Sequence, residues 1–130
     1  MASLDDGPNY PDAMADVTIF HNTACSTSRH ALDEAGAMGA DPEVVQYLKH
    51  PLDRQALLDL IAKLEDPPAD LVRKDGFFKD LGLDAGAYTT PEQVADLLVD
   101  HPRLMQRPVL VRGDRAIIGR PKDRVAAFLA

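Results

Sequence analysis

The one cysteine in the chain, Cys25, is the residue best suited to chemistry. It lies in the stretch "TIFHNTACSTSR", residues 18–29, where strand-like residues lead into a polar turn and then into a predicted helix start. Unpaired amides and the positive dipole end at such a start favour a thiolate, and the same amides can hold an oxyanion. A lone cysteine is most often a small buried apolar residue. The residues alone leave both interpretations open.

Two arginines, Arg107 and Arg120, each stand directly before a proline at the two ends of a predicted hairpin. Most arginines are solvated surface charges, and this is the alternative for both. A thiolate that attacks an anionic substrate meets like-charge repulsion, however, and the planar guanidinium group is the side chain best suited to offset it. The two arginines are therefore candidate oxyanion ligands.

The elements that must position these side chains follow a βαβ, helical block, ββα order. Strands are predicted at residues 17–20 and 44–48 around a helix that begins at residue 26, and a hairpin joins residues 109–111 to 116–118. Amphipathic or capped helices are predicted over residues 51–66, 68–75, 77–83 and 90–102, and a last helix closes the chain. This order resembles a thioredoxin-like α/β fold, a mixed four-stranded sheet flanked by helices, with the helical block inserted between its halves.

In such a fold the X-Pro bond before the first hairpin strand is often cis and lies against the reactive cysteine. Arg107–Pro108 is the matching bond, and we therefore expect Arg107 to point toward Cys25. Residues 16–130 are predicted to form one domain, and the Asp- and Pro-rich residues 1–15 are predicted to be a disordered extension.

Composition excludes several other classes of function. The net charge of −7 argues against general binding of nucleic acid or anionic membranes, although the basic last 30 residues leave room for a small anion. No apolar run is long enough to span a membrane, and a single cysteine without a secretory leader favours the cytoplasm. The histidines lack metal-ligand spacing, and the glycines form no phosphate loop.

Taken together, "HNTACSTSR", "LVRKD", "QRPVLV" and "GRP" resemble the successive motifs of the glutathione/glutaredoxin-coupled arsenate reductases, and "GRPKDRVAAFL" resembles a small chromosomal branch of them. The resemblance covers roughly residues 16–130. It implies that the nucleophile is Cys25 and that the three oxyanion-binding arginines are Arg73, Arg107 and Arg120.

The rest of the loop motif is also carried over by the resemblance. The family histidine that helps to hold the thiolate falls on His21. From the residues alone, a surface or capping role for His21 is as well supported as a role at the thiolate. Asn22, Ser28 and Arg29 complete the loop. The family usually has a proline where this chain has Thr23. That departure removes a constraint on the loop backbone without removing a reacting group.

The resemblance implies that the Cys25 thiolate attacks arsenate, that glutathione reduces the bound arsenic as a co-substrate, and that glutaredoxin resolves the mixed disulfide. No tightly bound cofactor and no metal are implied. Two alternatives stay open: a non-enzymatic regulator of the same fold, whose relatives switch through a Cys-x-x-Cys pair, and a glutathione-dependent oxidoreductase with another substrate. Ser28 stands where the second cysteine of that pair would be.

Overall fold

The computed structural model describes residues 17–130 and confirms the predicted α/β fold with its mixed four-stranded sheet. The extension predicted over residues 1–15 lies outside the described residues. The strands have the order β2-β1-β3-β4 across the sheet. Their bounds are β1 Val17–His21, β2 Glu43–Gln46, β3 Val109–Arg112 and β4 Arg115–Ile118.

The sheet is mixed because β1 lies parallel to β2 and antiparallel to β3. The helix α1 (Ser26–Ala37) makes the crossover that a parallel pair requires. Strands β3 and β4 form the predicted antiparallel hairpin. Its turn passes through Gly113, whose φ of 65° is a conformation that glycine adopts without steric cost.

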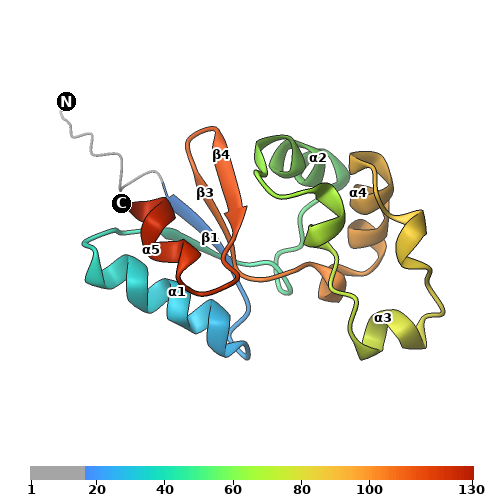
Figure 1. The fold of residues 1–130 in the computed structure, drawn as a ribbon, viewed down its shortest axis with the longest axis horizontal. Coiled ribbons are helices and arrows are strands. Elements are labelled where there is room, and N and C mark those ends of the chain that lie inside the picture. The colour runs from blue at the N-terminus through green and yellow to red at the C-terminus, as the bar shows by residue number, and fades with distance from the viewer. Residues whose placement is uncertain (1–16) are drawn as a thin grey trace.

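Each face of the sheet is covered by a different group of helices (Figure 1). Helices α1 and α5 (Arg124–Leu129) pack on one face with Ile19, Leu110 and Ile117. The inserted helical block packs on the other face with alternate residues such as Val109 and Ile118. The block consists of α2 Arg54–Lys63, η2 Pro68–Leu71, α3 Gly76–Asp80, η3 Ala85–Ala87, α4 Pro91–Asp100 and η4 Pro102–Leu104.

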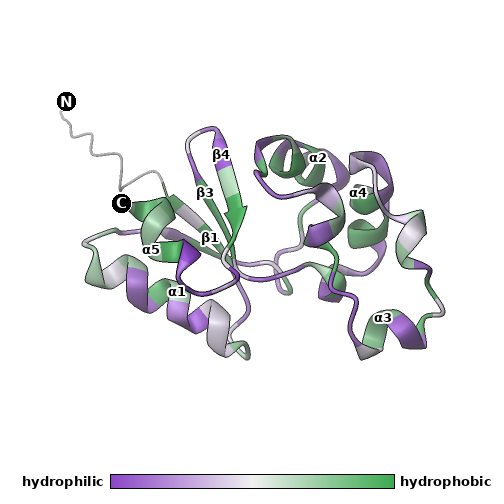
Figure 2. Cartoon of the chain, viewed as in Figure 1, coloured by the Kyte–Doolittle hydropathy of each residue, from purple (hydrophilic) through white to green (hydrophobic). Residues whose placement is uncertain are grey.

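Local sequence explains where the main helices of the block begin. Asp53 caps α2 by accepting the Ala56 amide at 2.8 Å, and Thr90 and Gln93 cap each other's backbone at the start of α4, as expected for this sequence. Figure 2 shows apolar residues along the strands and inside the helical block, and polar residues along the connections where the sheet meets the block. Those polar connections contain the candidate site.

Two predicted segments differ from the observed ones. The strand predicted at residues 44–48 ends at Gln46, because Tyr47 turns out of the sheet and buries its ring in the core of the helical block. The segment "PADLVRKD" is helical only over η2, after which Val72 forms an antiparallel bridge with Met105. Both departures are tertiary contacts that override a local preference.

Candidate active site

Cys25 is the N-cap residue of α1, as the polar turn predicts. Its amide donates to the Asn22 carbonyl at 3.0 Å, and Asn22 Oδ1 accepts the Ala24 amide at 2.9 Å. These bonds close a tight turn at the end of β1. Cys25 is only 9% exposed at the start of α1. The thiol is therefore held at the positive end of α1, where it remains available for other partners.

Two predicted arginines meet the thiol. Arg120 Nη2 lies 3.3 Å from Cys25 Sγ, and Arg120 Nε donates to the Arg107 carbonyl at 2.7 Å. The Arg107 side chain lies near the same thiol, close enough to stabilise the thiolate form. Its Nε atom is buried and has no partner among the described residues. The Arg107–Pro108 bond is cis, as predicted, and so is Arg120–Pro121, which the sequence analysis did not anticipate.

Opposing effects set the pKa of the Cys25 thiol. Burial is the largest effect and raises the pKa, because it removes water from a thiolate. A hydrogen bond from the Ser28 amide, a hydrogen bond from Arg107 and the charges of Arg107 and Arg120 together outweigh burial. The pKa of Cys25 is therefore lowered. A larger thiolate fraction at neutral pH makes the sulfur a better nucleophile.

His21 and Ser28 form a buried pair beneath the thiol. His21 is 5% exposed and Ser28 is fully buried. The Nδ1 atom of His21 lies 2.6 Å from Ser28 Oγ, which also accepts the Asn22 amide at 3.0 Å. Burial and then the charge of Arg29 lower the pKa of His21, so the imidazole is neutral at pH 7. His21 therefore contacts Ser28, and among its described hydrogen bonds none reaches Cys25.

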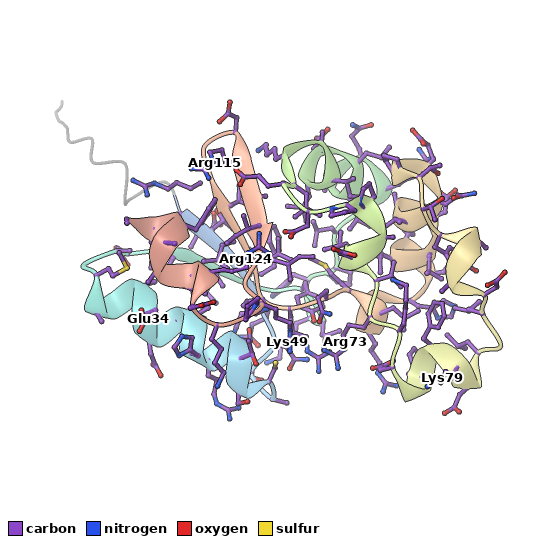
Figure 3. The ribbon with its side chains drawn as sticks, viewed as in Figure 1. Glu34, Lys49, Arg73, Lys79, Arg115 and Arg124 are labelled. Carbon is purple, nitrogen blue, oxygen red and sulfur yellow. The ribbon has the colours of Figure 1, made fainter. Side chains whose placement is uncertain are left out.

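Arg73, the third predicted arginine, is held apart from the thiol by other partners. Its Nη1 atom donates to Gln106 Oε1 at 3.0 Å, and its Nε atom lies 3.4 Å from Asp75 Oδ2. The backbone brings Arg73 to this place, because its amide donates to the Leu104 carbonyl at 2.7 Å. In Figure 3 Arg73 lies near the middle of the molecule, on the helical-block side.

Two residues near the site were missed by the sequence analysis. Gln106 Oε1 accepts from Arg73 and from the amide of Arg107, so it joins two of the arginines. The Tyr47 hydroxyl donates to the Met105 carbonyl at 3.4 Å. Burial raises the pKa of this phenol, and the nearby Arg107 and Asn22 side chains oppose that rise. A signal for Tyr47 was present: β1 and β2 are parallel, so the residues that follow them meet at one edge of the sheet.

Cavities border the arginine pair on both sides. One of about 170 Å³ adjoins Arg107, and one of about 290 Å³ adjoins Arg120. Both are lined mainly by polar and charged side chains. The arrangement can bring a small oxyanion to a thiolate and neutralise its charge with two guanidinium groups.

Within residues 17–130, no group of three or more His, Cys, Asp and Glu side chains could hold a metal ion. No helix in the same range has both the length and the apolar character needed to cross a membrane.

The fold and this site define a thioredoxin-like domain whose only cysteine lies at a helix start between two arginines. The sequence profile of the ArsC family matches residues 20–128, and the chain belongs to that family. The resemblance of the motifs to the arsenate reductase family is thereby confirmed.

Similar proteins support the assignment along nearly the whole chain. An "Arsenate reductase" of Neisseria meningitidis serogroup A is 37% identical over 118 residues, which cover 89% of this chain and 100% of that protein. "Uncharacterized protein YfgD" of Escherichia coli K12 is 40% identical over 111 residues, 84% of this chain and 92% of that protein. The structure "Arsenate reductase from Vibrio cholerae" is 29% identical with a TM-score of 0.75, and the match covers 85% of this chain and 95% of that one.

Proposed function

We propose that this protein is an arsenate reductase that uses the Cys25 thiolate as its nucleophile and takes electrons from glutathione and glutaredoxin. The observation that carries the proposal is the contact of Arg120 Nη2 with Cys25 Sγ at 3.3 Å, and the charge of nearby Arg107 adds to the stabilisation of the thiolate. A thiolate facing two guanidinium groups suits an anionic electrophile. Relatives named as arsenate reductases, one matched over its full length, support arsenate as that electrophile.

In the first step the Cys25 thiolate attacks arsenic(V). An As–S bond forms, an As–O bond breaks, and the departing oxygen takes up protons and leaves as water. Arg107 and Arg120 hold the remaining oxygens, and their positive charge offsets the repulsion between the thiolate and the arsenate dianion. The lowered pKa of the thiol increases the fraction present as the attacking thiolate.

In the second step the thiolate of glutathione attacks the Cys25 sulfur. An S–S bond forms, the S–As bond breaks, and its electron pair reduces arsenic(V) to arsenic(III), which leaves as arsenite. Glutaredoxin then removes glutathione from the mixed disulfide by thiol–disulfide exchange and restores the Cys25 thiolate. External thiols are required because the chain has one cysteine.

Arsenate-dependent oxidation of NADPH tests the proposal, with glutathione, glutathione reductase and glutaredoxin supplied. We expect turnover with the natural protein and none with Cys25→Ser, which removes the nucleophile while its hydroxyl preserves the turn. Circular dichroism and thermal unfolding establish that both proteins are folded. Replacing glutathione and glutaredoxin by thioredoxin and its reductase identifies the electron donor.

Absence of turnover with every donor, in a folded protein whose thiol alkylates readily at pH 7, would overturn the proposal. Activity with another electrophile would then support the general oxidoreductase. Inactivity toward all of them would favour the non-enzymatic regulator.

A further inference from the structure

Arg120 must be held against the thiol from a segment far away in the sequence. It follows β4 through Gly119, and 95 residues separate it from Cys25. The cavity of about 290 Å³ borders its side chain, so close packing does not enclose it on that side. Hydrogen bonds and backbone geometry must therefore fix its position.

One face of the segment from Ile118 to Arg120 is fixed by close packing. The Gly119 amide donates to the Pro108 carbonyl at 2.9 Å. A Cβ atom at Gly119 would lie 2.8 Å from Pro108 Cγ, a distance that side chains do not tolerate without a shift. The segment therefore lies against Pro108 with no spare room, and glycine is the residue that permits this approach.

The other face is held by an ion pair that the catalytic proposal does not use. Arg124 Nη1 lies 2.7 Å from Asp66 Oδ1, and it also donates to the carbonyls of Ile118 at 2.9 Å and Arg120 at 3.3 Å. Asp66 Oδ2 accepts the Ile118 amide at 2.9 Å. The pair thus binds both polar backbone groups of Ile118 and the carbonyl of Arg120 itself.

A neighbouring ion pair gives a natural comparison. Glu65 and Arg115 are in contact at 2.6 Å, but their side chains are 41% and 57% exposed, and exposed pairs contribute little. The side chains of Asp66 and Arg124 are 15% and 32% exposed. In Figure 3 Arg124 lies between the sheet and the helical block, whereas Arg115 lies toward the hairpin tip.

We propose that Asp66 and Arg124 are positioning residues, which hold the backbone from Ile118 to Arg120 so that the Arg120 guanidinium meets Cys25 Sγ. Asp66 belongs to the connection after α2, so the helical block sets the geometry of an arginine that belongs to the rest of the fold, the sheet with α1 and α5, which we call the sheet half. The consequence for turnover rests on the proposed function. The consequence for the thiol does not, because it concerns only the contact between Arg120 and Cys25.

A double-mutant cycle between Asp66→Asn and Arg120→Met tests the proposal, read out as the pH midpoint of Cys25 alkylation by iodoacetamide. We expect Asp66→Asn to raise the midpoint by about half a unit, since a guanidinium that moves away stabilises the thiolate less. In the Arg120→Met background the same substitution should change nothing. Glu65→Gln is the matched control, one residue away in the sequence, and should leave the midpoint unchanged.

A merely structural role predicts a different outcome. Asp66→Asn would then lower the melting temperature without moving the midpoint, or it would shift the midpoint equally with and without Arg120. Either result overturns the proposal. Arg124→Lys provides a second variant if Asp66→Asn does not fold, because lysine keeps the charge but cannot reach three acceptors with the same geometry. It should raise the midpoint in the same Arg120-dependent way.

Turnover is measured separately on the same variants. If the proposed function holds, Asp66→Asn should lower kcat/KM for arsenate about tenfold, the loss expected when one charge-assisted contact is misplaced. If the protein proves inactive toward arsenate, the alkylation cycle still decides whether Asp66 acts through Arg120. The two proposals can therefore fail independently.

Discussion

The sheet half and the helical block each supply arginines to the site, but these arginines differ in their hydrogen-bond partners. Arg107 and Arg120 flank the β3–β4 hairpin; Arg120 contacts the Cys25 sulfur, and the charges of both lower the pKa of the thiol. Arg73 comes from the helical block, and Asp75 and Gln106 already bind it. The difference indicates that two arginines are ready for an incoming oxyanion, whereas the third must first exchange its protein partners.

Replacement of either arginine of the sheet half should have the largest effect on activity. We expect Arg107→Met and Arg120→Met each to lower kcat/KM for arsenate about 100-fold, the usual cost of removing a donor that stabilises developing negative charge. Steady-state kinetics in the coupled assay measures this. Arg112→Ala is the control, because Arg112 Nη1 donates at 2.9 Å to the Leu129 carbonyl, away from the thiol. Equal losses in all three variants would refute the assignment.

Replacement of the block arginine should have a smaller effect. Arg73→Met is expected to lower kcat/KM about tenfold, because the free energy gained from the oxyanion is partly spent on breaking the bonds to Asp75 and Gln106. Asp75→Asn sharpens the test, since asparagine can still cap α3 but no longer neutralises Arg73. It should lower the arsenate concentration that protects Cys25 from iodoacetamide. Unchanged protection would show that Arg73 does not bind the anion.

The pKa of the Cys25 thiol should also distinguish Arg107 and Arg120 from Arg73. We expect Cys25 to alkylate with a midpoint below the free-cysteine value of about 8.5, and Arg107→Met or Arg120→Met to raise it. Arg73→Met should leave it unchanged, because the Arg73 guanidinium binds Gln106 and Asp75 rather than the thiol. Iodoacetamide kinetics from pH 5 to 9 measures all four proteins. A natural protein with a midpoint near 8.5 would contradict the activated thiolate.

The smallest effect concerns the pH dependence of stability. The pKa of buried His21 is lowered from 6.5, so the unfolded chain binds a proton more readily than the folded one. The stabilisation is present above pH 6.5 and is lost as the pH falls through the lowered folded-state value. Urea unfolding at pH 7.5 and 5.5 should show this loss in the natural protein and less of it in His21→Gln. An identical loss in both would assign the effect to other groups.

Much of the fold could be predicted because local patterns and tertiary packing agree. The strand before Cys25, the capped start of α4 and the hairpin turn at Gly113 each carry a local signal that the core then uses. Tyr47 and the "LVRKD" segment were assigned incorrectly because their structure comes from partners about 30 to 60 residues away. Single-sequence patterns do not encode such pairing.

The residues of the site also divide into those with a local sequence signal and those placed by distant contacts. Cys25, Arg107 and Arg120 could be found from the turn, the prolines and the resemblance, and the structure brings all three together. His21 could be found as a candidate from the loop motif, but its partner could not be predicted. In the structure it is buried against Ser28. The roles of Gln106, Asp66 and Arg124 depend on side-chain contacts across the fold, and no spacing along the chain indicates them.

The connection after α2 also has a dynamic consequence. A bridge joins Leu64 to Ala116, the Glu65 amide donates to the Ala116 carbonyl at 2.8 Å, and Asp66 binds Ile118, so three successive residues attach the block to β4. A fluctuation that detaches the block must break these bonds and release the segment that carries Arg120. Amide hydrogen exchange at Ile118 should therefore report such openings. Any opening that frees the block should therefore also disable the thiol site.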